Sequence, residues 1–344
     1  MPFFRIGLSS KTILTLALVA GVFFASAAPS MAQTPDEIIR SDTALVQLNV
    51  GVVDRQGRAI TSLAQGNFAV YEDGVRRPIV SFEPTNAPFS LVLLLDMSGS
   101  TVNFRQQLQQ AALRFLDALA PEDRVAVIQF NGKGTKELSG FTTDRRDTAY
   151  AIGNATGKGE THFYQALDYA LKQLSKEGKR RKAIVTMTDG LDTELRKIDR
   201  DAAAAKADTN ETAIAAIKPD ENPKLAAVLS DADRQGVTLF PLALPSGDSK
   251  RLPFPNSVQI AIYKAARVRL ETLANRTGGR LLEITGLDQL ARLYAETAAN
   301  LRALYTIAYQ PPAERLHDGR WREIRIDVTY PELIARTKPG YFAR

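Results

Sequence analysis

Residues 90–100 read SLVLLLDMSGS, an unbroken apolar run that ends in an aspartate followed by two serines. A run of this kind, without alternation of polar residues, is typical of a parallel strand that is buried on both faces. Asp96 ends the run, and Ser98 and Ser100 follow at i+2 and i+4. In an open α/β sheet the carboxyl ends of the strands border the ligand crevice, so these three side chains are predicted to face it.

Strand-like and helix-like segments alternate through the rest of the central region. Apolar residues recur at helical spacing over 103–119, and a final helix is predicted at about 287–303. The further predicted strands are 124–130, 135–141, 182–190, 237–244 and 278–284. This alternation predicts an α/β fold with a doubly wound, mostly parallel sheet and helices on both faces. Residues 195–233 and 245–256 are predicted to be surface excursions that the core does not require.

The regions on either side have a different pattern. Residues 44–87 and 304–344 contain short alternating strands separated by turns, with no helix-length periodic stretch in the first of them. Neither region has enough strands to be stable alone. We therefore predict that the two regions pair into one small β-sandwich, with the α/β domain, residues 88–303, inserted between them.

Two further oxygen-bearing side chains are predicted to reach the crevice next to Asp96. Thr161 lies in a Gly-rich loop that enters a helix, and Asp189 follows the strand expected to neighbour the first one. With Ser98 and Ser100 these make five hard oxygen donors, which suit Mg²⁺, Mn²⁺ or Ca²⁺. An isolated D-x-S-x-S is often only a helix N-cap, but its combination with two more loops favours a metal site.

These motifs together resemble the metal-ion-dependent adhesion site of von Willebrand factor type A domains. The layout of the chain after its leader is also similar to the bacterial VWFA-related family. The resemblance implies that Ser98, Ser100 and Thr161 are metal ligands, and that Asp96 and Asp189 bind directly or through water. It further implies a divalent cation, Mg²⁺ or alternatively Mn²⁺ or Ca²⁺, as the cofactor.

A cation held mainly by neutral hydroxyls keeps much of its charge and attracts an anionic ligand. We therefore expect a binding module, not an enzyme, whose partner is a protein with an exposed Asp or Glu. A metal-dependent hydrolase is the alternative, although catalysis needs a general base or second cation. A second alternative is a structural component of the cell envelope, in which the metal only orders loops. His162 and Asp192 are possible partner contacts. The alternative interpretations are that His162 is an ordinary surface histidine and that Asp192 only forms a turn.

Residues 1–32 have the features of a Sec-type signal peptide. Arg5 and Lys11 precede an apolar run, and a small-x-small sequence ends at Ala32. We expect cleavage there and a periplasmic or secreted protein; membrane contact is expected only if the leader stays uncleaved as an anchor. The chain has no cysteine, so core burial alone must hold the fold. The basic run 176–182 is predicted to be a solvated helix end, so no nucleic-acid partner is expected.

Overall fold

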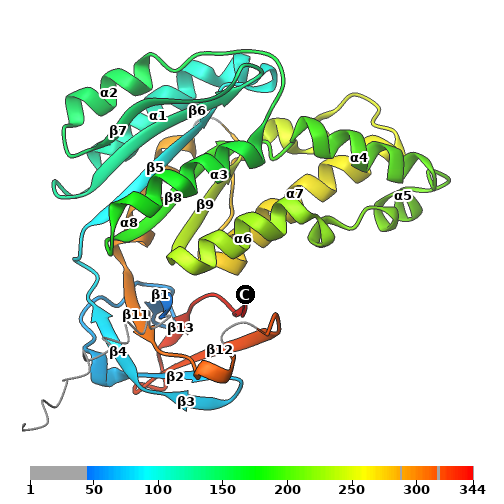
Figure 1. Cartoon of the computed structure of the whole chain (residues 1–344). Helices are drawn as coiled ribbons and strands as arrows, with labels where there is room; N and C mark the ends of the chain where they lie inside the picture. The colour runs from blue at the N-terminus through cyan, green and yellow to red at the C-terminus, as the bar shows by residue number, and fades with distance from the viewer. Residues whose placement is uncertain (1–44, 287–288, 316–317, 344) are drawn as a thin grey trace, which may run out of the picture. The chain divides into compact units, whose positions relative to one another are not determined.

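The apolar run that precedes Asp96 forms an inner strand of a six-stranded sheet in the computed structural model of the chain (Figure 1). The structure describes residues 45–286, 289–315 and 318–343. The sheet order is β10-β9-β8-β5-β6-β7, and every neighbouring pair is parallel except β6 with β7. The bounds are β5 Phe89–Asp96, β6 Arg124–Asn131, β7 Gly134–Thr142, β8 Arg181–Thr188, β9 Val237–Ala243 and β10 Leu282–Glu283. The predicted α/β class with a mostly parallel sheet is confirmed.

Helices cover both faces of this sheet because successive side chains of β5 point to opposite sides. Leu91, Leu93 and Leu95 belong to one core cluster, and Val92 and Leu94 belong to another. The first cluster includes residues of α1 (Arg105–Asp117), α2 (Arg145–Gly153) and α8 (Leu290–Arg302). The second includes residues of α3 (Phe163–Leu174), α6 (Pro223–Gln235) and α7 (Ser257–Thr277). An inner strand buried on both faces is what its unbroken apolar sequence predicts.

The prediction that residues 195–233 lie outside the core is wrong for α6. Leu225, Val228 and Leu229 of this helix pack in the second core cluster, against the sheet. Two shorter helices of the same region, α4 (Thr193–Ala204) and α5 (Asn210–Ala216), form a separate small cluster with α7. The short 3-10 helices are η1 Gln65–Asn67, η2 Gly99–Phe104, η3 Ser175–Glu177, η4 Pro219–Glu221, η5 Pro245–Gly247, η6 Ser249–Arg251 and η8 Ala313–Arg315.

The strands before and after the α/β region pair with one another in two four-stranded sheets. In one sheet β1 is antiparallel to β11, and in the other β2 is antiparallel to β12. The sheet orders are β13-β1-β11-β4 and β14-β12-β2-β3. The bounds are β1 Val46–Val53, β2 Phe68–Glu72, β3 Val75–Arg77, β4 Ile79–Glu83, β11 Leu304–Tyr309, β12 Trp321–Val328, β13 Ile334–Arg336 and β14 Gly340–Phe342. Each sheet therefore contains strands from both ends of the described chain, and their apolar side chains share one core.

The two chain segments that join the strand pairs to the α/β sheet meet at Arg181, the first residue of β8. Its guanidinium donates to the carbonyls of Thr85 at 3.0 Å, Ala87 at 2.9 Å and Leu301 at 3.3 Å, and also to Leu304. The side chain is fully buried. The prediction that the basic run 176–182 is solvated is therefore wrong at its end, because backbone carbonyls replace water around this charge.

The predicted signal peptide, residues 1–32, lies outside the described residues. Within the described ranges, no helix combines the length and the apolar character that a membrane crossing requires.

Candidate metal centre

Asp96, the last residue of β5, is held in one orientation by two hydrogen bonds. Its Oδ1 accepts from the backbone N–H of Ser98 at 3.0 Å, and its Oδ2 accepts from the hydroxyl of Thr188 at 2.7 Å. Thr188 ends β8, which pairs in parallel with β5. The carboxylate is only 1% exposed. The carboxyl ends of two adjacent strands thus fix the orientation of this buried carboxylate.

The serines follow Asp96 in the turn that leads into η2. Ser98 is fully buried, whereas Ser100 is exposed, and their hydroxyl oxygens are 3.2 Å apart. Ser98 precedes η2 with extended backbone angles, but its side chain makes no capping hydrogen bond among the described residues. The hydroxyls therefore do not serve as the N-cap that an isolated D-x-S-x-S motif favours.

Thr161 reaches the same place from the loop before α3. Its backbone N–H donates to the hydroxyl of Thr193 at 3.0 Å, and its carbonyl accepts from the N–H of Thr193 at 2.9 Å. The preceding loop is tied to the motif turn, because the N–H of Gly99 donates to the carbonyl of Gly159 at 2.9 Å. These backbone contacts position a loop that has no regular secondary structure.

Asp189 directly follows β8 and rests against residues 245–247. Its Oδ1 accepts from the N–H of Leu191 at 3.1 Å, and its Oδ2 lies 3.5 Å from the hydroxyl of Ser246. A Cβ at Gly247 would lie 2.5 Å from the carbonyl oxygen of Asp189, so only glycine fits there. Gly247 and Pro245 are buried. The prediction that residues 245–256 are a surface excursion is therefore wrong for this part, which forms the floor under Asp189.

Three of the five predicted donors, Ser100, Thr161 and Asp189, line one hollow of about 380 Å³. Its lining residues are Ser100, Gly159, Glu160, Thr161, Asp189, Leu191, Asp192, Thr193 and Arg196. Asp96 and Ser98 are buried and joined to this lining through the contact between the two serine hydroxyls. The solvent exposure of these side chains thus increases from the buried carboxylate of Asp96 to the exposed hydroxyl of Ser100.

Burial and mutual repulsion act together on the two carboxylates. Burial raises the pKa of Asp96, and the negative charge of Asp189 raises it further. Burial also raises the pKa of Asp189, partly offset by a hydrogen bond from the Ser100 hydroxyl. No lysine or arginine of the described residues forms a salt bridge with either aspartate, although the positive charge of Arg267 also lowers the pKa of Asp189. Two buried carboxylates beside neutral hydroxyls form an all-oxygen donor set that matches a hard divalent cation.

Carboxylates alone do not form this site. No group of three or more histidine, cysteine, aspartate or glutamate side chains in the described part of the chain is arranged to hold a metal. Any cation at this hollow therefore depends on the serine and threonine hydroxyls as well as on the two aspartates.

The two possible partner contacts take different positions. Asp192 lines the hollow, but its carboxylate caps α4, accepting from the N–H groups of Glu194 and Leu195 at 3.1 and 3.2 Å. Its other oxygen accepts from the N–H of Tyr164 at 3.4 Å. His162 is not among the lining residues; its Nε2 lies 3.7 Å from a carboxylate oxygen of Glu160.

Three side chains that contribute to this site were not predicted from the sequence. Thr188 orients Asp96, Ser246 contacts Asp189, and Arg196 brings a cation to the rim of the hollow. Thr188 directly precedes Asp189, so its place beside a predicted donor was visible in the sequence. Arg196 lies four residues after the capping Asp192, one helical turn into α4, and nothing in its local sequence marks it.

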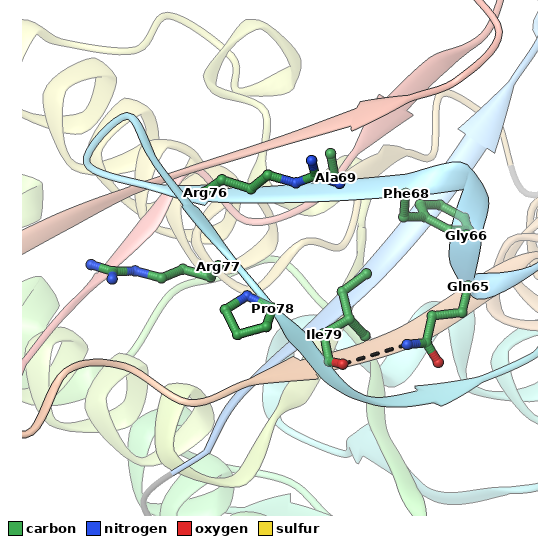
Figure 2. Close-up of a pocket in the computed structure, with 8 residues that line it drawn as sticks. All are labelled: Gln65, Gly66, Phe68, Ala69, Arg76, Arg77, Pro78 and Ile79. Atoms are coloured by element: carbon green, nitrogen blue, oxygen red, sulfur yellow. Dashed lines mark hydrogen bonds between the residues drawn. The ribbon is translucent and has the colours of Figure 1, made fainter.

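A larger hollow of about 570 Å³ lies elsewhere, beside β2, β3 and β4. Figure 2 shows its lining, which includes Arg76, Arg77 and the amide of Gln65 bonded to the carbonyl of Ile79. It contains no carboxylate and no hydroxyl. Its volume exceeds that of the first hollow, but its chemistry does not suit a cation.

Residues 91–191 match the family model of the von Willebrand factor type A domain. The matched stretch begins in β5 and contains all five predicted donors. No curated protein matches the chain.

Several solved structures resemble the chain at low identity. Von Willebrand factor type A from Catenulispora acidiphila is 14% identical, with a TM-score of 0.46; the match covers 89% of this chain and 64% of that one. The von Willebrand factor domain of the type V pili tip protein Mfa5 from Porphyromonas gingivalis is 14% identical, with a TM-score of 0.45, covering 62% and 95%. Mussel byssus proximal thread matrix protein 1, with zinc in its own adhesion motif, is 14% identical, with a TM-score of 0.45, covering 66% and 48%. This chain thus spans less than two thirds of the first of these proteins and about half of the mussel protein.

Proposed function

We propose, from the premise that this chain contains a von Willebrand factor type A domain, that it is a binding module which grips an acidic group of a partner protein. Domains of this class are commonly interaction or adhesion modules and are generally not catalytic. In our proposal one divalent cation is held by Asp96, Ser98, Ser100, Thr161 and Asp189. Mg²⁺ is the first candidate, with Mn²⁺ and Ca²⁺ as the others.

One observation supports the proposal: Asp189, Ser100 and Thr161 line one open hollow, and the buried Asp96 and Ser98 lie next to them, with no salt bridge to either aspartate among the described residues. Buried charge is costly unless it is paired or coordinates a metal. When bound, the cation supplies a positive charge that a carboxylate oxygen of the partner can coordinate. Ser100 and Thr161 line the hollow and bring no negative charge to it, so a carboxylate that reaches the cation from this side meets neutral hydroxyls and not a further anion.

Arg196 supports an anionic occupant independently of the metal. Its side chain is exposed at the rim and forms no ion pair with a described carboxylate. A guanidinium can bind both oxygens of a carboxylate. It therefore adds a second attraction for an Asp or Glu of the partner.

We further propose that the mature chain acts outside the cytoplasm. The support is the leader alone, with its basic start, apolar run and small-x-small ending at Ala32.

Titration calorimetry with each of the three cations tests the metal site. We expect one binding event for the mature wild-type protein and none for Asp96→Ala. The matched control is Asp201→Ala, which removes an exposed carboxylate on α4 and should leave binding unchanged. Equal binding heats for the wild type and Asp96→Ala would reject the site.

Crosslinking in the cell envelope, followed by mass spectrometry, tests the partner. Capture should fall on addition of a chelator and return on addition of Mg²⁺. Equal capture of a partner with chelator present, or by Asp96→Ala, would contradict binding through the cation. It would favour a purely structural metal.

A further inference from the structure

A further hollow, of about 460 Å³, lies beside the candidate metal centre and has a distinctly basic lining. Its lining residues are Gln129, Asn131, Lys133, Gly134, Thr135, Lys136, Thr156, Gly157 and Lys158. Three of them are lysines and none is acidic. We refer to this hollow as the lysine pocket.

The three ammonium groups of the lysine pocket are free to meet a ligand. Lys133, Lys136 and Lys158 are exposed, and none forms an ion pair with a carboxylate of the described residues. Like charges gathered around one hollow produce a local positive potential. Charge therefore selects an anionic ligand.

The walls of the lysine pocket are held by hydrogen bonds that do not involve the lysine side chains. The N–H of Thr156 donates to the Gln129 amide oxygen at 2.9 Å, and the amide nitrogen of Asn131 donates to the Thr156 carbonyl at 3.2 Å. The N–H of Gly132 donates to the carbonyl of Lys158 at 3.1 Å. The turn between β6 and β7 is thus tied to the loop that carries Lys158, and both walls keep their places without a ligand.

This loop also forms a wall of the candidate metal centre. Lys158 lines the lysine pocket, whereas Gly159, Glu160 and Thr161 line the hollow of the metal site. Three residues of fully extended chain span at most about 11 Å, so the two hollows are close neighbours. An extended peptide rises about 3.3 Å per residue. Side chains two to four positions apart on one bound segment can therefore reach both.

We infer that the lysine pocket receives a second acidic side chain of the same partner segment whose first carboxylate binds at the metal site. The partner would then present a short acidic stretch and not a single Asp or Glu. This inference rests on the proposed function. It adds to it a specificity surface that the motif residues do not contain.

Fluorescence anisotropy with two synthetic peptides tests the inference. One blocked Gly-Ser peptide carries a single central Glu, and the other carries the same Glu and a further Glu three positions away on each side. We expect the wild type with Mg²⁺ to bind the second peptide about tenfold more tightly, since each added charge pair contributes modestly. The gain should shrink as salt is added.

Matched variants assign the gain to the lysine pocket. The triple variant Lys133→Gln, Lys136→Gln, Lys158→Gln should bind the two peptides equally, with Mg²⁺ titration and single-Glu binding unchanged. The control triple variant Lys197→Gln, Lys206→Gln, Lys218→Gln removes three other exposed lysines and the same total charge. It should keep the tenfold preference.

The outcomes separate this inference from the proposed function. Mg²⁺-dependent binding of the single-Glu peptide without any gain for the second peptide would overturn the lysine pocket and leave the proposed function intact. A gain lost equally in both triple variants, or an oligonucleotide that displaces the second peptide as well as an equally charged peptide does, would overturn it too. Binding of the second peptide that survives chelator and is lost only in the first triple variant would reject the proposed function while retaining the acidic preference of the pocket.

Discussion

Arg181 keeps its charge inside the protein because backbone carbonyls take the place of the water that it loses. Burial lowers the pKa of its guanidinium to about 10, so the group is still charged at neutral pH. Its ring contact is with Phe89, whose centroid lies 4.0 Å from the guanidinium carbon. The carbonyls that it satisfies belong to both connections between the strand pairs and the α/β sheet.

Replacing this residue should be strongly destabilising. Arg181→Met leaves the buried carbonyls of Thr85, Ala87 and Leu301 without their donor, and an unsatisfied buried group typically costs about 1–3 kcal/mol. We expect the free energy of unfolding to fall by about 3 kcal/mol or more, measured by urea denaturation. Lys179→Met, at an exposed position two residues earlier, should change it by less than about 0.5 kcal/mol. Similar midpoints for the two variants would show that the guanidinium does not hold the connections.

The contrast between these two residues shows what local sequence can report. Asp96, Ser98 and Ser100 could be predicted to lie together because they stand at fixed offsets from the end of an apolar strand, and the structure places them in contact with one another. Arg181 stands in a run of basic residues that reads as solvated. Its burial depends on carbonyls from segments about a hundred residues away on either side, which no local pattern records.

At the scale of the secondary-structure elements, helix α7 was missed for a related reason. The face that it buries includes Arg269, whose guanidinium forms a buried ion pair with Asp199 of α4 at 2.6 Å. A charged residue on the packed face interrupts the apolar periodicity by which a helix is recognised. The parallel strands, by contrast, were predicted well because both of their faces are apolar. Boundaries still differed: β10 covers only Leu282–Glu283, shorter than predicted.

The start of α4 gives a prediction that separates capping from ligand binding. Asp192→Ala removes the side chain that accepts from the N–H groups of Glu194 and Leu195, and an N-cap of this kind is worth about 1 kcal/mol. We expect that loss in thermal or urea unfolding, whereas Asp192→Asn should lie close to the wild type. The Kd for Mg²⁺ should change by no more than about twofold in both variants, because this carboxylate caps the helix and does not bind the ion. A twofold change in Kd corresponds to about 0.4 kcal/mol of binding free energy. Loss of Mg²⁺ binding in Asp192→Asn would instead make this carboxylate part of the metal site.

At the scale of the whole molecule, the strand pairs depend on both ends of the described chain. Deleting residues 304–344 removes β11, which lies between β1 and β4, and also β12, which pairs with β2. The remaining strands cannot form either sheet, and isolated short strands are not stable. We expect rapid proteolysis within residues 45–87 of the truncated protein, measured by limited digestion and mass spectrometry. Persistent protection of that region would show that it folds without the C-terminal strands.

The metal should affect the stability of the folded molecule in a way that one substitution can reveal. Without a cation, the buried carboxylates of Asp96 and Asp189 repel each other, so Asp189→Asn should be at least as stable as the wild type in chelator. With Mg²⁺ the order should reverse, because a ligand that binds only the folded state stabilises it by about 2.7 kcal/mol at a hundredfold excess over its Kd. Thermal unfolding of both proteins, each with chelator and with saturating Mg²⁺, measures the four values. We expect Mg²⁺ to raise the melting temperature of the wild type and to leave that of Asp189→Asn unchanged.

The folded state itself should not require the metal. The apolar strands of the sheet bury their own core, so both proteins should remain folded in chelator. Equal responses of the two proteins to Mg²⁺ would mean that the ion acts elsewhere, and unfolding of the wild type in chelator would mean that the cation holds the fold and not only the partner.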